Sequence, residues 1–378
     1  MSNPQGRIPF SQEVEPWPDE VDGADLLSAL SGVFSRHLSL PRGAADAAAL
    51  WIIHCHAFDA FPVSPFLTFS SPEKRCGKTS AMILLRFLVP KPLLASNLTP
   101  ASAFRMIDKF KPTLLVDEAE TFVGKHEEFR GILNAGHTRE ASHVIRCVGR
   151  SFEPRAFSVW CPKAIALIGS LPSTLEDRSI IIPMRRKTSQ ERVEPLRMNE
   201  IVPELTRLSR MSKRWAADNK DTIASVVVEV PSGLHDRAAD NWTPLLQIAE
   251  VAGGAWRQRG RDAADALTAV EQDPGIGVQL LGDIKGIFRE KGQDSLSSEQ
   301  IVQDLAAMED RAWPEHNHGK PITKVQLARL LRPFGIHPTS IRTGPGSTPK
   351  GYRRFDFEDA FTRYLPAEPQ QPQQEGVF

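Results

Sequence analysis

A strand-loop-helix motif constrains the fold more than any other feature of the chain. Apolar residues 65–70 predict a strand, Gly77-Lys78-Thr79 closes the loop that follows, and residues 79–88 have the pattern of a helix. Backbone N–H groups in such a loop can turn inward around a phosphate, toward which the helix directs the positive end of its dipole. Pro72 stands where the G-x-x-x-x-G-K-[ST] pattern has its first glycine, so its fixed φ shapes the opening turn. The motif predicts a cradle for nucleotide phosphates within an α/β fold.

The motif also gives individual residues a role. Lys78 can reach the γ-phosphate of ATP, and the Thr79 hydroxyl can coordinate Mg²⁺. The alternative is an ordinary turn that binds no ligand. The predicted nucleotide-binding residues of the motif are Glu73, Lys74, Arg75, Cys76, Gly77, Lys78, Thr79 and Ser80.

A second apolar strand, predicted over residues 113–116, ends in the carboxylates Asp117 and Glu118. In a parallel sheet both strands end at the same edge, so Asp117 is expected beside Thr79, where it would hold Mg²⁺ through water. Glu118 can orient the water that attacks the γ-phosphate. Taken alone, the acids have a solvated strand end as their alternative, but the two motifs in this order favour nucleotide hydrolysis.

Two further positions are predicted to act on the reaction. Ser170 follows an apolar strand over residues 164–168, expected between the first two strands, and is a candidate sensor of the γ-phosphate. A plain strand-ending serine is the alternative. Arg178 comes directly before another apolar strand, from which it can cross a subunit interface and stabilise the transition state in a neighbouring copy. The competing interpretation is a surface ion pair with Glu176 or Asp177.

A β-hairpin is predicted between the carboxylate strand and the Ser170 strand, from residues 144–148 and 156–160. In a ring-shaped motor such a hairpin would point into the central channel, where arginines hold phosphates and an aromatic ring stacks on a base. A solvated hairpin is the alternative. The predicted nucleic-acid contacts on this hairpin are Arg146, Arg150, Phe152 and Arg155.

The C-terminal part is predicted to be winged-helix-like, with helices near 280–290, 298–308 and 323–332 and a hairpin whose second strand spans 352–357. Residues 320–363 contain nine basic and three acidic side chains, an excess of six positive charges that suits a phosphate backbone. A basic surface without a ligand is the alternative. The predicted DNA contacts here are Lys324, Arg329, Arg353 and Arg354.

Strands separated by helices predict a mostly parallel sheet covered on both faces. The expected parts are a disordered acidic lead-in (1–22), N-terminal helices packed on the core (23–62), a nucleotide-binding core (63–190), a helical lid (191–275), a winged-helix-like domain (276–365) and a disordered tail (366–378). Arg237, which opens a lid helix, is predicted to fold back onto the γ-phosphate. Ion pairing with Asp236 or Asp240 is an equally good account.

Composition limits the classes of partner. The 46 basic and 46 acidic side chains cancel, so any affinity for nucleic acid must come from local clusters. The cysteines form no C-x-x-C pair, and we expect no membrane helix and no signal peptide, which favours a soluble, cytoplasmic protein. His54-Cys55-His56 does not favour a metal site, because residues two apart on a helix face different directions.

The chain resembles a domain-of-unknown-function family of P-loop ATPases from bacterial, phage and plasmid replication proteins. The likeness lies in Ser71-Pro72-Glu73-Lys74-Arg75-Cys76-Gly77-Lys78-Thr79, Val116-Asp117-Glu118-Ala119-Glu120 and Asp240-Asn241-Trp242. That family is similar to superfamily III and other hairpin-bearing AAA+ helicases, which are often joined to a primase.

The resemblance implies that Lys78 and Thr79 bind ATP-Mg²⁺, that Asp117 and Glu118 are the metal and catalytic carboxylates, and that Arg178 is an arginine finger. It also makes a primase an expected partner, encoded separately because this chain leaves no room for one ahead of the ATPase.

Three functions follow from these predictions. The first is an ATP-driven DNA helicase or translocase. It is expected to be a homo-oligomeric ring, a hexamer, that moves along or unwinds DNA during replication of a mobile element, phage or plasmid. The second is a DNA-binding ATP switch, an initiator or regulator that never unwinds DNA. A small-molecule kinase is weaker, because Glu118 beside Asp117 suits water activation better than phosphate transfer to a nucleoside.

Overall fold

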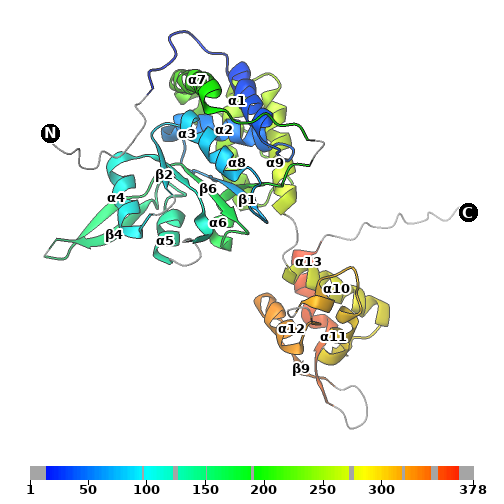
Figure 1. The fold of residues 1–378 in the computed structure, drawn as a ribbon. Coiled ribbons are helices and arrows are strands. Elements are labelled where there is room, and N and C mark those ends of the chain that lie inside the picture. Colours follow the sequence, from blue (N-terminus) through cyan, green and yellow to red (C-terminus); the bar gives the residue numbers. More distant parts are fainter. Residues whose placement is uncertain are drawn as a thin grey trace, which may run out of the picture. The chain divides into compact units, whose positions relative to one another are not determined.

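The chain divides into two compact units, with the boundary between residues 271 and 272 (Figure 1). The computed structural model describes residues 14–95, 98–121, 127–149, 151–188, 191–271, 276–316, 320–341 and 348–365. Within these ranges no helix is both long enough and apolar enough to cross a membrane.

A five-stranded parallel sheet forms the centre of the first unit. In spatial order its strands are β2 (Pro92–Ala95), β3 (Thr113–Val116), β6 (Lys163–Ile168), β1 (Phe66–Ser71) and β7 (Ser179–Pro183). All neighbouring strands are parallel, which confirms the predicted parallel sheet, with β6 between β3 and β1. Their carboxyl ends therefore lie along one edge, and their amino ends along the other.

Both faces of this sheet are buried, and side chains alternate between them with the period of two that strands impose. On β1, Leu67 and Phe69 join one hydrophobic cluster, whereas Phe66 joins the other. On β6, Ala164 faces the first cluster and Ile165 the second. The sheet is thus the middle layer of three.

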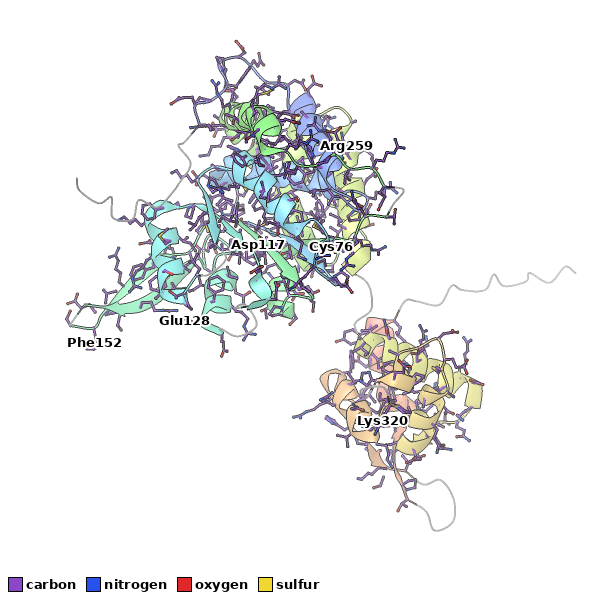
Figure 2. All side chains as sticks on the ribbon, in the orientation of Figure 1. Cys76, Asp117, Glu128, Phe152, Arg259 and Lys320 are labelled. Atoms are coloured by element: carbon purple, nitrogen blue, oxygen red, sulfur yellow. The ribbon has the colours of Figure 1, made fainter. Side chains whose placement is uncertain are left out.

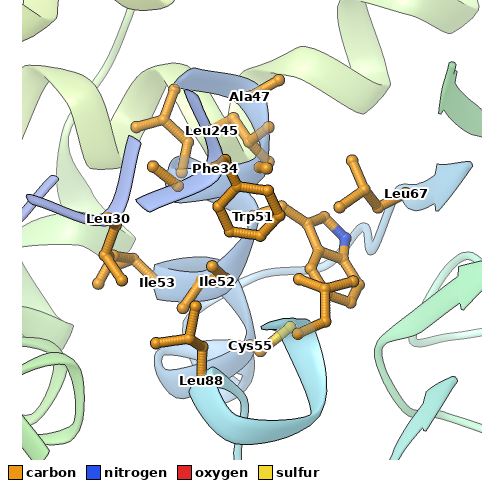
Figure 3. Packing of buried hydrophobic residues seen from close by; sticks show 14 of the residues in the cluster. Leu30, Phe34, Ala47, Trp51, Ile52, Ile53, Cys55, Leu67, Leu88 and Leu245 are labelled. Atoms are coloured by element: carbon orange, nitrogen blue, oxygen red, sulfur yellow. The ribbon is translucent and has the colours of Figure 1, made fainter. Parts of the chain in front are cut away.

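Helices from both ends of the unit cover the first face. They are α1 (Gly23–His37), α2 (Ala44–His56), α3 (Lys78–Leu88), α7 (Met198–Ser225), α8 (Asp236–Ala252) and α9 (Trp256–Glu271). Trp51 of α2 is fully buried among Phe34, Leu67 and Leu245, and its indole N–H donates to the Pro65 carbonyl at 3.0 Å (Figure 3). The helices predicted as a lid therefore share one core with the N-terminal helices.

The second face carries α4 (Pro100–Phe110), α5 (Glu127–Ala135), the short α6 (Ser173–Glu176) and a β-hairpin. The hairpin strands β4 (His143–Val148) and β5 (Glu153–Ser158) pair from His143↔Ser158 to Val148↔Glu153. The hairpin was predicted, but β5 begins three residues earlier than expected. The edge strand β2 was not predicted, because its first residue, Pro92, has the appearance of a break; proline is tolerated at that position of a strand.

The second unit combines helices with a three-stranded antiparallel sheet of order β8-β10-β9. Its elements are α10 (Ile276–Lys291), β8 (Ser295–Ser297), α11 (Ser298–Ala306), η3 (Trp313–Glu315), α12 (Lys324–Leu331), η4 (Arg332–Phe334), β9 (Thr339–Ser340), β10 (Lys350–Arg353), η5 (Arg354–Phe357) and α13 (Glu358–Tyr364). The Trp313 indole donates to the Asp283 carboxylate at 2.7 Å, which anchors the long connection between α11 and α12 to α10.

One predicted strand of this unit is wrong in part. The strand expected over residues 352–357 ends at Arg353, and a 3₁₀ turn and α13 follow. Tyr352, Phe357 and Phe361 are all buried in the core of this unit. Tyr352 and Phe357 are five apart and would point to opposite faces of a continuous strand, so burying both in one core requires the chain to leave the extended conformation.

Buried neutral histidines give the first unit a predicted pH dependence. His54 on α2 is 0% exposed and burial lowers its pKa to about 3, while burial lowers the pKa of His56 and of His137 to about 4. Between these values and about 6.5, the unfolded chain binds protons that the folded chain does not. Stability contributed by these groups is therefore full above pH 6.5 and is lost as the pH falls.

We expect the free energy of unfolding to fall by up to about 1.4 kcal/mol per pH unit for each such histidine between about pH 6 and 4.5. His54→Gln should make that slope shallower, as measured by urea denaturation at several pH values. His143→Gln, at an exposed hairpin position, is the control and should keep the wild-type slope. An unchanged slope in His54→Gln would contradict the assignment.

Candidate functional site

A cavity of about 560 Å³ lies at the carboxyl edge of the sheet, between the loop after β1 and the end of β3. Figure 2 shows Cys76 and Asp117, which belong to these two segments. The residues that line the cavity are Lys74, Arg75, Cys76, Gly77, Lys78, Thr79, Ser80, Asp117, Glu118, Glu120 and Ile168. The predicted loop and the predicted pair of carboxylates therefore meet in one place.

The loop holds its shape through contacts within itself. The Ser71 hydroxyl and the Cys76 thiol both donate to the Glu73 carbonyl, at 2.6 Å and 3.4 Å. Arg75 and Gly77 have positive φ values, 67° and 88°. Such values are costly for a residue with a side chain and are found where the surrounding structure enforces them. Cys76 is buried, so its thiol acts here as a structural donor.

Lys78 is the first residue of α3, and its side chain turns back over the loop. The ammonium group donates to the Ser71 hydroxyl and to the Glu73 carbonyl, the latter at 3.3 Å. Thr79 follows at the exposed start of the helix. The N-terminal N–H groups of α3 and the Lys78 charge are thus presented to the same cavity, which is the arrangement that attracts an anion.

Carboxylates from the end of β3 form the opposite wall. The Asp117 N–H donates to the Ala95 carbonyl of β2, and the Asp117 carboxylate accepts from the Glu118 N–H at 3.0 Å. Glu118 has a φ of 54°, an outlier for a non-glycine residue. Glu120 accepts from the Ile168 N–H at 3.2 Å and so links this turn to β6. The strained backbone at Glu118 is of the kind that clusters at functional sites.

The cavity has a clear division of charge. Lys74, Arg75 and Lys78 come from the loop, whereas Asp117, Glu118 and Glu120 come from the β3 end. A polyanion placed against the loop would leave the carboxylates facing its far side, where a divalent cation could join the two. The chemistry that this arrangement supports is the binding of a phosphate chain together with a hard metal ion.

The segment after β7 braces the outside of the loop. Arg186 forms an ion pair with Glu73 at 2.7 Å and donates to the Lys74 carbonyl at 3.2 Å. Glu73, predicted to bind the nucleotide, is therefore turned toward this brace, and only its backbone carbonyl contacts Lys78. The segment after β7 therefore holds the loop in position from the solvent side through Arg186.

Besides Glu73, three predicted residues do not line the cavity. Ser170 is exposed just beyond the end of β6. Arg178 lies before β7, where its carbonyl accepts from the N–H of Phe66, the first residue of β1. Arg237 is close enough to Arg178 for charge repulsion to lower the pKa of Arg178. Both arginines are thus at the amino edge, and the prediction that Arg237 folds back onto the phosphate of its own chain is wrong.

The hairpin arginines are held by the rest of the unit. Arg146 forms an ion pair with Glu128 of α5 at 2.9 Å, and Arg155 approaches Asp108 of α4 at 3.7 Å. Phe152 stands at the tip with 76% of its surface exposed (Figure 2), and Arg150 lies outside the described residues. Of the described residues predicted to contact nucleic acid on this hairpin, the two arginines are thus engaged by acidic side chains, whereas Phe152 projects into solvent.

The predicted DNA-contacting side chains of the second unit lie at its surface. Lys324, the first residue of α12, pairs with Glu299 of α11 at 2.5 Å, and Arg354 approaches Glu358 at 3.7 Å. Arg329 of α12 and Arg353 of β10 are exposed. Exposed ion pairs of this kind contribute little to stability and can be exchanged for another anion.

Comparison with known proteins places the chain in a family. A Saccharopolyspora erythraea protein described as "Uncharacterized 28.9 kDa protein in xis 5'region" is 34% identical over 190 residues, which are 49% of this chain and 70% of that protein. This chain belongs to the same family as that protein. Residues 183–364 match the family described as "Protein of unknown function (DUF3631)". The residues that line the cavity precede this matched segment.

Two solved structures have a low similarity to the chain. "The A form apo structure of NrS-1 C terminal region-CTR" has 14% sequence identity and a TM-score of 0.43, over 90% of this chain and 77% of that chain. "The A form apo structure of NrS-1 C terminal region-CTR(305-718)" has 11% identity and a TM-score of 0.39, over 90% and 76%.

Glu120 and Ile168 line the cavity but were not predicted. A signal for Glu120 existed, since it is the third acid of Asp117-Glu118-Ala119-Glu120. Ile168 has no such signal, because an apolar residue at the end of a strand gives no indication of a ligand. Its place in the site follows from β6 lying between β1 and β3.

We expect Gly77→Ala to lower the free energy of unfolding by about 1 to 2 kcal/mol, because it forces a side chain into the left-handed region. A Cβ at Gly77 would also lie 3.3 Å from Leu38 Cδ2 and from Met184 Cε. Gly131→Ala in α5 is the control, since a Cβ there meets nothing within 4 Å, and it should be neutral or stabilising. Equal effects in urea denaturation would contradict the argument.

Proposed function

We propose that the chain is an ATP-hydrolysing motor that acts on DNA, a helicase or translocase of mobile-element, phage or plasmid replication. The observation that carries the proposal is that Lys78 and Thr79 line the same cavity as Asp117 and Glu118. We interpret the first unit as a P-loop, AAA+-like ATPase core with an inserted hairpin, and the second unit as winged-helix-like. The partners of the chain would be DNA, further copies of the chain and a separately encoded primase. We expect the copies to form a hexameric ring.

The residues of the cavity fit a nucleotide with Mg²⁺. Backbone N–H groups of the loop and the Lys78 ammonium would bind the phosphates, and Lys78 would exchange its present contacts with Ser71 and Glu73 for phosphate oxygens. The described residues contain no cluster of three metal-ligating side chains. A site with few protein ligands suits Mg²⁺, which is usually held by one or two carboxylates plus substrate phosphates. The Thr79 hydroxyl would hold the ion directly and the Asp117 carboxylate would hold it through water, and the ion would offset phosphate charge.

Hydrolysis needs a positioned water and a balancing charge. Glu118 would accept a hydrogen bond from the attacking water, and its constrained backbone would fix the direction of the carboxylate. Arg178 would supply positive charge to the transition state from a neighbouring copy, since its place at the amino edge prevents it from reaching the cavity of its own chain. Water attack on the γ-phosphorus then breaks its bond to the bridging oxygen and releases phosphate and ADP.

Two surfaces support contact with DNA. The projecting Phe152 can stack on a base at the hairpin tip. In the second unit, the helices and strands follow one another as α10, β8, α11, α12, β9 and β10, which is the order of a winged helix. The exposed Arg329 of its third helix and Arg353 of its sheet can contact phosphates.

A second candidate function is a DNA-binding ATP switch, a replication initiator or regulator that does not unwind DNA. The ion pairs of Arg146 and Arg155 with α5 and α4 favour it, because arginines held in this way are less available to grip a moving strand. In that case the nucleotide would control assembly, and the second unit would provide the affinity for DNA.

Calorimetry with a non-hydrolysable ATP analogue and Mg²⁺ tests the first step. We expect Lys78→Ala to weaken binding by about 10- to 100-fold, because it removes one charge-assisted contact. Glu118→Gln should keep the affinity and lower ATP turnover by at least about 100-fold. Lys109→Ala, on α4 away from the cavity lining, is the control. If the wild-type chain binds no nucleotide, the proposed function is wrong.

Assays with DNA separate the motor from the switch. A motor should hydrolyse ATP faster with single-stranded DNA and should separate a forked duplex. Phe152→Ala should weaken single-strand binding by about 5- to 100-fold if its ring stacks on a base, whereas Arg146→Ala should have a smaller effect because that arginine is paired with Glu128. DNA binding with hydrolysis but no strand separation would support the switch instead.

A further inference from the structure

Two arginines meet at the amino edge of the sheet, away from the cavity. Arg178 lies directly before β7, and Arg237 lies in the first turn of α8. Burial and the nearby charge of Arg237 lower the pKa of Arg178, although Asp177 acts in the opposite direction. Within the described ranges neither guanidinium has an ion-pair partner closer than 4 Å, and Arg178 Nε is buried without a hydrogen bond. Arg178 Nη1 donates to the Thr174 carbonyl at 2.5 Å, so the unpaired donor is its Nε, and the exposed Arg237 lies nearby.

A buried hydrogen-bond network keeps the two arginines in place. The Asn241 side chain of α8 donates to the Asp177 carbonyl at 3.0 Å, and its carbonyl oxygen lies 2.8 Å from His137 Nε2. Asn241 and His137 are each 2% exposed. Burial lowers the pKa of His137 to about 4, so its ring is neutral near pH 7. Because the Asn241 oxygen can only accept a hydrogen bond, the single ring proton is on Nε2. Asn241 therefore joins the Arg178 turn, the Arg237 helix and the segment after α5.

Holding like charges together costs free energy unless an anion lies between them. That anion cannot be the phosphate chain in the cavity of the same chain. β1 is six residues long, with Arg178 beside its first residue and the loop after its last. At roughly 3.3 Å per residue, the two edges are about 16 Å apart. Any triphosphate that the arginine pair contacts therefore belongs to another chain.

We infer that Arg178 and Arg237 act together on the triphosphate bound in the cavity of a second copy, and that Asn241 and His137 are positioning residues for this pair. The inference rests on the proposed function and adds to it. Two guanidinium groups offer more donors than one, and they can follow the charge that spreads over the γ-phosphate oxygens as the bond to the leaving oxygen breaks. Arg237, placed in the first turn of α8, would thereby couple that helix to hydrolysis in the neighbour.

Mixing two inactive variants tests the inference. Lys78→Ala keeps the arginine pair but lacks a working cavity, whereas Arg237→Ala keeps the cavity but lacks one cation. We expect Arg237→Ala alone to lower kcat by about 100-fold while nucleotide affinity of the separate chain stays unchanged. In an equal mixture half of the cavities are intact and half of the arginine pairs are intact, so about one quarter of the interfaces should recover activity. No recovery would overturn the inference.

Three controls make the outcomes distinguishable. Arg197→Ala, at an exposed arginine paired with Glu200 on α7, should keep full activity and needs no partner. If wild-type chain hydrolyses ATP and Arg178→Ala recovers with Lys78→Ala while Arg237→Ala does not, only the inference fails. If the wild-type chain does not hydrolyse ATP, the proposed function fails, and the inference falls with it.

The positioning role of Asn241 has its own readout. Asn241→Ala should lower kcat with little change in KM, and it should also recover when mixed with Lys78→Ala, which a folding defect would not do. The wild type should trap ADP with aluminium fluoride, and Asn241→Ala should lose that trapping while retaining ADP. If Arg237→Ala instead weakens single-stranded DNA binding in fluorescence anisotropy and shows no recovery, the pair is a DNA contact and the inference is wrong.

Discussion

The parallel pairing of β6 between β3 and β1 is the constraint on which the first unit depends. Because all five strands run in one direction, every strand end that carries chemistry is assigned to one edge or the other. The loop after β1 and the acids after β3 lie at the carboxyl edge, and Arg178 and Arg237 lie at the amino edge. A register shift of one residue would turn each side chain of a strand to the opposite face of the sheet, away from the hydrophobic cluster in which it packs.

The two edges are complementary in charge and incomplete on their own. The cavity combines loop cations with carboxylates but holds no arginine from the amino edge. The amino edge holds two arginines, and among the described residues no carboxylate lies within 4 Å of either guanidinium, although the Asp177 charge raises the pKa of Arg178. A head-to-tail contact between copies would bring one edge against the other, and a contact of that kind closes into a ring when its rotation allows. This division of charge between the two edges of the sheet is what supports the proposal of a ring.

Local patterns were sufficient to predict the sheet strands β1, β3, β6 and β7, the hairpin, and most of the cavity lining. Each rests on a short signal, such as an apolar run that ends in Asp117 and Glu118 or a loop that ends at Lys78. The failures depend on distant contacts. Arg237 lies at the amino edge because α8 packs on β7 and because Asn241 of α8 donates to the Asp177 carbonyl. Arg146 is less able to contact DNA because it is paired with Glu128 of α5. No window of sequence contains those partners.

Lys163 joins the base of the hairpin to the segment that contains His137. This lysine, at the first position of β6, is fully buried, and burial lowers its pKa. Its ammonium donates to the carbonyls of Gly136, Val159 and Cys161 at 2.9, 3.2 and 2.8 Å. Gly136 directly precedes His137, and Val159 directly follows β5. A displacement of the hairpin base must therefore stretch these buried contacts or carry the His137–Asn241 network with it, because an unsatisfied buried ammonium is too costly to leave behind.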